Sequence, residues 1–114
     1  MKISELKPQP DGKTNFKLSQ YNFIPTFSGC YVLTTFNDDI LYIGQAVNLR
    51  RRFEQHLKNP EKTLPTETGK AISFFFLSWN KNEIGKLERT WLNIYENKHG
   101  TLPILNKIHS PIDG

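Results

Sequence analysis

Glu88 occupies a position where a carboxylate is unexpected. Residues 82–100 are predicted to form an amphipathic helix. Its apolar stripe contains Ile84, Leu87, Trp91, Ile94 and Tyr95. At about 100° per residue, Glu88 projects inside this stripe. Because a carboxylate that faces a core is costly unless it is paired or bound, Glu88 predicts a cation, either a metal ion or an arginine, on the inner side of the fold.

Arg52 and His56 form a second polar pair, on a helix predicted over residues 49–58. Asn48 precedes this helix and can cap its first turn. The two side chains lie one turn apart along one edge of the buried stripe. That stripe consists of Leu49, Phe53 and Leu57. The same pattern also fits a solvated basic helix with a partly buried histidine, so the helix alone does not decide between structure and chemistry.

Other basic residues of this helix lie off that edge. Arg50 and Arg51 fall on the opposite edge and on the back, and with Lys58 they are candidates for contacts to nucleic-acid phosphates. The net charge of +4 permits an acidic partner such as nucleic acid and does not demand one.

Tyr31 and Tyr42 lie on two segments that are predicted to form a β-hairpin. If Asp38 and Asp39 form a two-residue turn, both tyrosines lie on the same face of the hairpin, whereas a three-residue turn places them on opposite faces. Paired tyrosines in a hairpin are also explained by cross-strand packing alone.

The elements that would position these residues follow from the hydrophobic pattern. Strands are predicted at residues 29–36 and 40–44, and a third, at residues 71–79, is apolar enough to be central in the sheet. Residues 59–70 are expected to be a polar loop, and residues 102–106 to pack back on the domain. The order strand, strand, helix, strand, helix predicts an α+β fold with a small three-stranded antiparallel sheet flanked by helices.

Composition limits the class of protein. The 114 residues allow one domain, and a hydrophobic fraction of 37% favours a globular chain. The single cysteine, Cys30, excludes an intrachain disulfide and is expected to pack as a small core residue. No segment is long and apolar enough to span a membrane, and no signal peptide is recognisable, so a reducing cytoplasm is the expected compartment.

Several motifs occur together in a family-like order. Gly29-Cys30-Tyr31 and Tyr42-Ile43-Gly44 resemble the paired signature of the GIY-YIG nucleases, and the resemblance spans residues 29–107. It continues through Asn48, Leu49, Arg52 and His56, then through Leu87 and Glu88, and ends with Pro103 and Asn106. We therefore expect a GIY-YIG-like nuclease domain at residues 29–110, a partly packed N-terminal arm at 1–28 and a tail at 111–114.

The resemblance implies a metal-dependent endonuclease that hydrolyses phosphodiester bonds of DNA. It makes Glu88 the ligand of a single Mg²⁺ or Mn²⁺ ion, a hard cation that keeps several waters. It makes Arg52 the group that binds the scissile phosphate. Tyr31 would activate the attacking water, and because a phenol is a weak base, Arg52, the metal or His56 would have to lower its pKa.

The remaining site residues have supporting roles in this resemblance. Tyr42 would position the phosphate or the water, and His56 would hydrogen-bond to Tyr31 or to the phosphate. Gly44, Gln45 and Asn106 would support the site, with Asn106 bracing it. Repair-type members carry lysine where this chain has Gln45, and Cys30 replaces an apolar isoleucine.

Two other functions stay open. A non-catalytic nucleic-acid-binding module would keep the fold without the reaction. A structural domain would pair Glu88 with Arg52 in a partly buried salt bridge. We expect the catalytic groups to line one small basin open to solvent, weak sequence specificity or targeting by a protein partner, and no membrane association; the sequence does not determine the oligomeric state.

Overall fold

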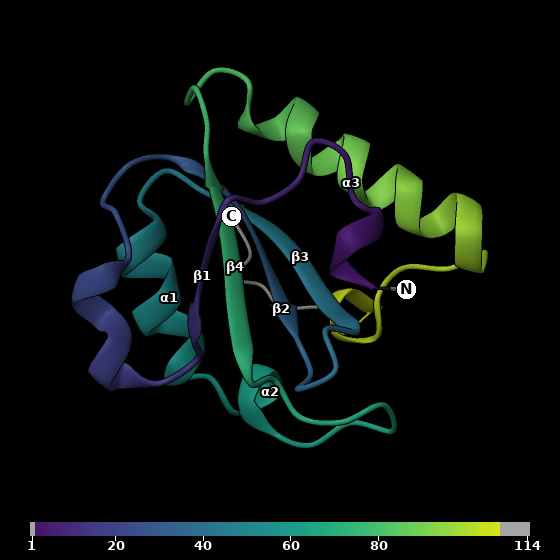
Figure 1. Cartoon of the computed structure of the whole chain (residues 1–114), viewed down its shortest axis with the longest axis horizontal. Coiled ribbons are helices and arrows are strands. Elements are labelled where there is room, and N and C mark those ends of the chain that lie inside the picture. The colour runs from purple at the N-terminus through teal and green to yellow at the C-terminus, as the bar shows by residue number, and fades with distance from the viewer. Residues whose placement is uncertain (1, 108–114) are drawn as a thin grey trace.

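A four-stranded antiparallel sheet forms the centre of the molecule in the computed structural model, which describes residues 2–107 (Figure 1). Its strands, in spatial order, are β1 (Gly12–Asn15), β4 (Ser73–Ser78), β2 (Gly29–Thr34) and β3 (Ile40–Ala46). The helices are α1 (Leu49–Leu57), α2 (Pro60–Thr63) and α3 (Ile84–His99), and short 3-10 turns cover Ile3–Glu5, Leu18–Phe23 and Ile104–Lys107.

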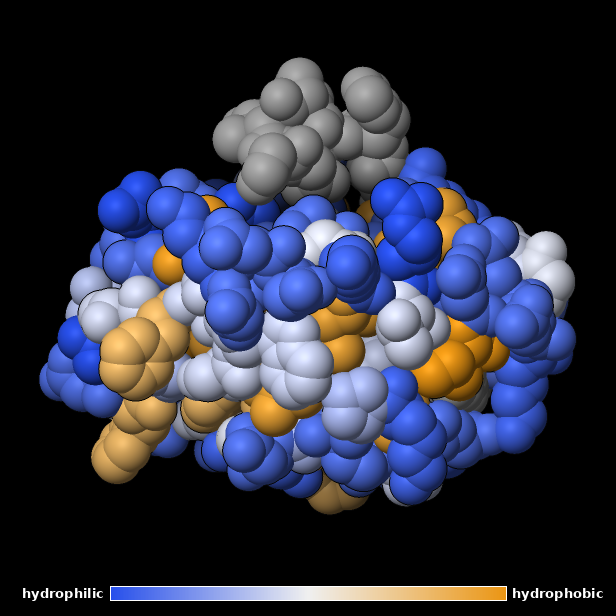
Figure 2. All heavy atoms as spheres, turned by 90° about the horizontal axis from the view of Figure 1, so that it is seen from above, coloured by the Kyte–Doolittle hydropathy of each residue, from blue (hydrophilic) through white to orange (hydrophobic). Residues whose placement is uncertain are grey.

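The sheet is covered on both faces, α1 lying on one side and α3 on the other (Figure 1). Each side has its own hydrophobic cluster. The cluster under α1 includes Tyr31, Leu49 and Phe53, and the cluster under α3 includes Ile43 and Trp91. Both faces of β2 are covered, so every one of its residues is buried, and its sequence is apolar from Cys30 to Leu33. The outer surface seen in Figure 2 is mainly hydrophilic, with separate hydrophobic patches.

The predicted α+β fold with an antiparallel sheet is confirmed, but the predicted number of strands is wrong. The additional strand, β1, belongs to the segment that we expected to be an arm. Its sequence, Gly12-Lys13-Thr14-Asn15, contains no apolar residue and therefore gave no strand signal. It becomes a strand because it pairs with β4, with Lys13 opposite Phe75, so the pairing edge of β4 decides its conformation.

Other parts of the N-terminal segment are packed on the domain. Ile3 and Leu6 are buried in the cluster under α3, and the indole nitrogen of Trp91 donates a hydrogen bond to the carbonyl of Pro8 at 2.9 Å. Lys98 forms an ion pair with Glu5. These contacts join residues 2–8 to α3. The predicted tail at residues 111–114 lies outside the described residues.

The connection between β2 and β3 is longer than the two-residue and three-residue turns that the sequence analysis considered. Thr34 pairs with Ile40, and residues 35–39 connect the strands, with Asp38 at a φ of 65°. Tyr31 lies opposite Gly44, and Tyr42 lies opposite Leu33. Both tyrosines therefore lie on the same face, as the two-residue turn had predicted, because the register differs from that prediction by an even number of residues.

The two main helices begin and end close to their predicted limits. The Asn48 side chain accepts a hydrogen bond from the backbone N–H of Arg51, which caps α1. Gly100 ends α3 with a φ of 73°, a left-handed conformation that glycine adopts without steric strain. In the described part of the chain, no helix has the length and apolar content needed to cross a membrane.

Candidate functional site

The hydroxyl of Tyr31 and Nε2 of His56 lie 2.5 Å apart, a short hydrogen bond between β2 and α1. Both residues are buried, and the Tyr31 ring stacks on Phe74 with 5.2 Å between the ring centroids. His56 reaches the sheet because it follows Arg52 by one helical turn on the inner edge of α1. His56 was expected to hydrogen-bond to Tyr31 or to the phosphate, and the structure contains the bond to Tyr31.

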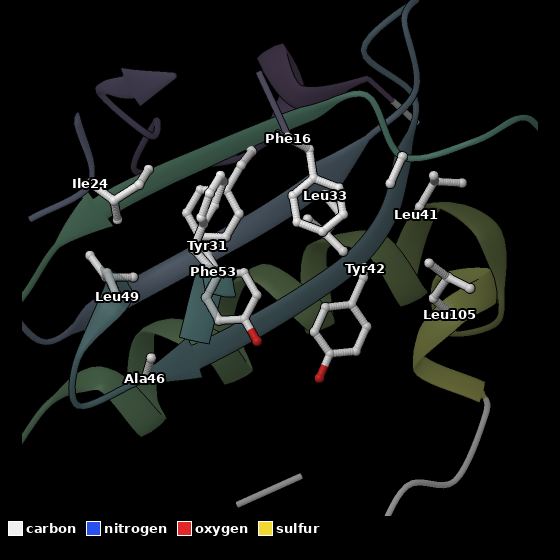
Figure 3. Close-up of a cluster of buried hydrophobic side chains, with 12 residues drawn as sticks. Phe16, Ile24, Tyr31, Leu33, Leu41, Tyr42, Ala46, Leu49, Phe53 and Leu105 are labelled. Carbon is white, nitrogen blue, oxygen red and sulfur yellow. The ribbon is translucent and has the colours of Figure 1, made fainter. Parts of the chain in front are cut away.

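Tyr42 completes an aromatic group with these two residues. Its ring centroid lies 6.0 Å from that of Tyr31 and 5.4 Å from that of His56. Figure 3 shows the hydroxyls of both tyrosines pointing to the same side of the sheet. The hydrophobic parts of the rings pack in the core, and the polar ends face one region.

Gly44 makes this arrangement sterically possible. A Cβ atom at this position would lie 2.5 Å from both Cζ and the hydroxyl of Tyr31, and 2.8 Å from the Tyr42 ring. Gly29 is restricted in a similar way, because a Cβ there would lie 2.2 Å from the carbonyl oxygen of Leu77 on β4. The two glycines of the paired signature therefore allow a close approach of ring to strand and of strand to strand.

Burial sets the protonation of the pair. Burial raises the pKa of Tyr31 well above 10, with a further increase from Tyr42, while the charge and hydrogen bond of Arg52 act in the opposite direction. Burial lowers the pKa of His56 to about 3, and the positive charges of Lys62 and Arg52 add to this shift. At neutral pH, Tyr31 is therefore a phenol and His56 a neutral imidazole.

Gln45 connects Arg52 with Glu88. The Nη1 of Arg52 donates a hydrogen bond to the backbone carbonyl of Gln45 at 3.3 Å, and the side-chain Nε2 of Gln45 donates to Oε1 of Glu88 at 3.1 Å. Arg52 comes from α1 and Glu88 from α3, on opposite faces of the sheet. They approach each other around β3 because this strand is at the edge of the sheet.

Glu88 is only half-buried and lines a cavity of about 250 Å³ between β3 and α3. The residues around it are Gln45, Gly85, Glu88, Arg89, Leu92, Asn93 and Glu96. Among residues 2–107, no group of three acidic, histidine or cysteine side chains could hold a metal ion as a protein cage. The residues present fit a different kind of site, in which the carboxylates of Glu88 and Glu96 line the same space and leave room for a largely hydrated ion such as Mg²⁺.

Cys30 lies on the face of the sheet next to α3. Its thiol is buried and donates a hydrogen bond to the carbonyl of Ile84 at 3.3 Å. Burial, assisted by the nearby charge of Glu88, raises the pKa of this thiol to about 12. Cys30 is thus a core residue without thiolate character, in line with its predicted packing role.

Asn106 binds the edge strand next to the site. Its Oδ1 accepts a hydrogen bond from the N–H of Ile43, and its Nδ2 donates to the carbonyl of the same residue, both at 2.9 Å. These backbone groups lie on the outer edge of β3, between Tyr42 and Gly44. The side-chain amide therefore acts as a short additional strand at this edge.

The three basic residues expected to contact nucleic acid have different surroundings. Arg50 binds the carbonyls of Ile24 and Asn22 and lies over the ring of Tyr21, so its contacts join the N-terminal segment to α1. Arg51 is exposed, and Lys58 is 3.9 Å from Glu54 in an exposed ion pair. Their role toward nucleic acid stays a prediction.

Lys62 is a residue of this region that the sequence did not indicate. It lies in the segment predicted to be a polar loop, where the structure has α2, and its side chain is fully buried. Its Nζ lies 4.5 Å from the centroid of the Tyr42 ring. The only local signal was Asn59 followed by Pro60, a pair typical of a helix start, and it does not indicate burial.

The expectation of a basin open to solvent is wrong for the aromatic part of the site. Tyr31 is 0% exposed, Tyr42 5% and His56 4%. Arg52 and Glu88 are half-buried. The reason is that both tyrosines belong to the hydrophobic cluster under α1, whereas Arg52 and Glu88 lie at the rim of the sheet.

Known proteins share these features of sequence. The profile of the GIY-YIG catalytic domain matches residues 27–100, which is more than half of the chain. UvrABC system protein C of Mycoplasma mycoides subsp. mycoides is 26% identical over 85 residues, covering 73% of this chain and 15% of that protein. The same-named proteins of Caldicellulosiruptor saccharolyticus and Streptococcus sanguinis are 40% identical over 43 residues and 38% over 45.

Those two matches cover 38% and 40% of this chain and 7% of each relative. The chain thus corresponds to a small part of the length of these relatives. The matched residues include both halves of the paired signature, Arg52, His56 and Glu88. By this profile match and these relatives, which support a nuclease, the chain belongs to the GIY-YIG family.

Proposed function

We propose that this chain is a divalent-metal-dependent endonuclease that hydrolyses phosphodiester bonds of DNA, with one site per chain and low sequence specificity. One observation carries the proposal. A continuous series of contacts runs from His56 and Tyr31 through Arg52 and Gln45 to Glu88. It joins a proton acceptor, a phosphate-binding cation and a metal-binding carboxylate, which are the groups that phosphodiester hydrolysis needs.

Arg52 and Glu88 would hold the substrate. Both are half-buried at the edge of the sheet, where a DNA backbone can approach them. The guanidinium of Arg52 donates hydrogen bonds to phosphate oxygens and stabilises the negative charge that develops during the reaction. Glu88 would hold a single Mg²⁺ or Mn²⁺ ion, which supplies charge neutralisation at the phosphate when bound.

Tyr31 and His56 would move the proton of the attacking water. Because burial raises the pKa of Tyr31, this residue does not act as a phenolate formed in advance. In the tautomer with an unprotonated Nε2, the Tyr31 hydroxyl donates to His56 across 2.5 Å. The Tyr31 oxygen can then accept the proton of the water while its own proton passes to His56. Tyr42 would position the phosphate or the water.

The burial of Tyr31 and Tyr42 favours one alternative, a nucleic-acid-binding module that keeps the fold without cleavage. Such a module would bind DNA through Arg51, Arg52 and Lys58 and leave it intact. We also propose a cytoplasmic location, supported by the single buried thiol, and targeting to DNA by a protein partner, since no recognition motif is apparent.

A nicking assay tests the proposal. Purified protein is incubated with supercoiled plasmid and Mg²⁺ or Mn²⁺, and compared with Glu88→Gln and Arg52→Ala. Glu67→Gln, at an exposed position outside the site, is the matched control. Nicking that chelator stops, that the site substitutions abolish and that the control retains is the expected result. Binding of DNA by wild type, Glu88→Gln and the control without any nicking would show the alternative to be correct.

A further inference from the structure

We propose that the ammonium group of Lys62 binds a backbone phosphate of the DNA. This inference rests on the proposed function, because it assigns one more substrate contact to the same site. Lys62 Nζ is fully buried, and no described residue provides a hydrogen-bond acceptor for it. A buried ammonium group with three N–H donors and no acceptor is rare in folded proteins, since its charge has lost water without gaining a partner.

The contacts that Lys62 does make are insufficient to compensate for this loss. Nζ lies over the Tyr42 ring, 4.5 Å from its centroid, and this cation–π contact offsets only part of the desolvation of an ammonium group. None of the ion pairs between described residues includes Lys62. The position therefore lacks an anion.

The surroundings indicate which anion fits. Tyr42 and His56 belong to the candidate site, and Lys62 and Arg52 are both close enough to His56 to disfavour its positive charge. Because His56 is neutral, Lys62 and Arg52 are the charged groups beside Tyr42 and His56, and both are positive. Two cations that flank neutral hydrogen-bonding groups match a phosphodiester, which has one negative charge and two unbridged oxygens.

The position of Lys62 in the chain gives the phosphate a route to it. Lys62 lies in α2, a helix of only four residues. Leu64, the residue that follows this helix, is exposed. Local opening of such a short surface element is much easier than unfolding of the sheet. We infer that α2 opens when DNA binds, and that Lys62 then exchanges its burial for a contact with phosphate.

A comparison of four proteins tests this inference without relying on catalysis. The urea midpoints of wild type, Lys62→Met, Lys62→Gln and Lys86→Met are measured at constant ionic strength with chloride, inorganic phosphate or a short DNA duplex. Lys86 is the matched control, because it is an exposed lysine on α3 paired with Glu83. Phosphate and DNA should raise the midpoint of wild type and of Lys86→Met clearly more than that of either Lys62 variant, in which Arg52 remains as the second phosphate contact.

The midpoint in chloride provides a second readout. Methionine fills a similar volume without a charge, so Lys62→Met should be at least as stable as wild type. If Lys62 were only a structural partner of Tyr42, its loss would lower the midpoint instead. Two results would overturn the inference. One is that phosphate and DNA raise the midpoints of both Lys62 variants as much as that of wild type. The other is that free phosphate raises the midpoint of wild type and DNA does not.

Cleavage separates this inference from the function on which it rests. In the nicking assay, Lys62→Met should reduce kcat/KM about tenfold to a hundredfold, as loss of a charged hydrogen bond does. Wild-type-like cleavage by the folded variant would refute the role of Lys62 and leave the nuclease intact. Absence of nicking by wild type would refute the nuclease, and the urea midpoints would still decide whether Lys62 binds phosphate.

Discussion

The hydroxyl of Tyr31 on β2 lies 2.5 Å from Nε2 of His56 on α1, and both groups are buried. This bond joins two segments that are distant in sequence and couples the strand with the first signature motif to the helix that carries Arg52. It also places a phenol and a neutral imidazole in direct contact, so that a proton can pass between them without crossing water.

Replacement of Tyr31 by phenylalanine should separate chemistry from packing. The ring and its stacking on Phe74 remain, but the proton-transfer group is lost, so we expect nicking to fall about 10²- to 10⁴-fold. The unfolding free energy should fall by about 1–3 kcal/mol, because Nε2 of His56 loses its partner inside the core. Plasmid nicking and urea unfolding measure the two effects. Tyr21→Phe, outside the site, should nick like wild type; equal losses in both variants would contradict the role of the Tyr31 hydroxyl.

His56 should make stability depend on acidity. Burial holds its pKa at about 3 in the folded chain, compared with an ordinary value of 6.5. As the pH falls below about 6.5, the unfolded chain takes up a proton that folded His56 does not, so stability present above that pH is lost toward pH 3, by up to ~1.4 kcal/mol per pH unit. Urea unfolding as a function of pH should show this slope in wild type and in His99→Gln, and a smaller one in His56→Gln. An unchanged slope in His56→Gln would mean that other groups cause it.

Gly44→Ala should disturb the tyrosine pair. The new methyl group would lie 2.5 Å from the Tyr31 hydroxyl, and overpacking of this kind lowers stability by about 1–3 kcal/mol. Gly85→Ala is the matched control for stability, because the nearest atom to its Cβ is 3.9 Å away and alanine favours a helix. Its unfolding free energy should rise by about 0.4–1 kcal/mol. Equal effects of the two substitutions in urea unfolding would show that Gly44 is not sterically restricted.

Asn106→Ala should weaken the edge of the sheet. It removes two hydrogen bonds to the backbone of Ile43 and exposes the outer edge of β3, at a loss of about 1–3 kcal/mol. Amide hydrogen exchange of Ile43 should become faster, whereas that of Val32 on β2 should change less. Asn82→Ala, in an exposed turn, should leave both amides unchanged. Unaltered exchange at Ile43 in Asn106→Ala would argue against its bracing role.

The sequence by itself determined the main elements of this fold. The apolar periodicity of α3, the Asn48 cap of α1 and the apolar run of β4 depend on residues close in the chain, so local pattern was sufficient to find them. It also identified the residues that the structure connects: Tyr31, His56, Arg52 and Glu88. These side chains extend from regular elements, where residue spacing fixes direction.

Only the tertiary structure decided the remaining features, because they depend on contacts between distant segments. β1 is a strand because β4 offers it a partner, and the tyrosines are buried because α1 and its neighbours cover them. Gln45 connects the two faces of the sheet because β3 is at its edge. In the sequence, Lys62 belongs to a segment predicted to be a polar loop. Only the folded structure shows that its side chain is buried and lies over the Tyr42 ring, beside the site.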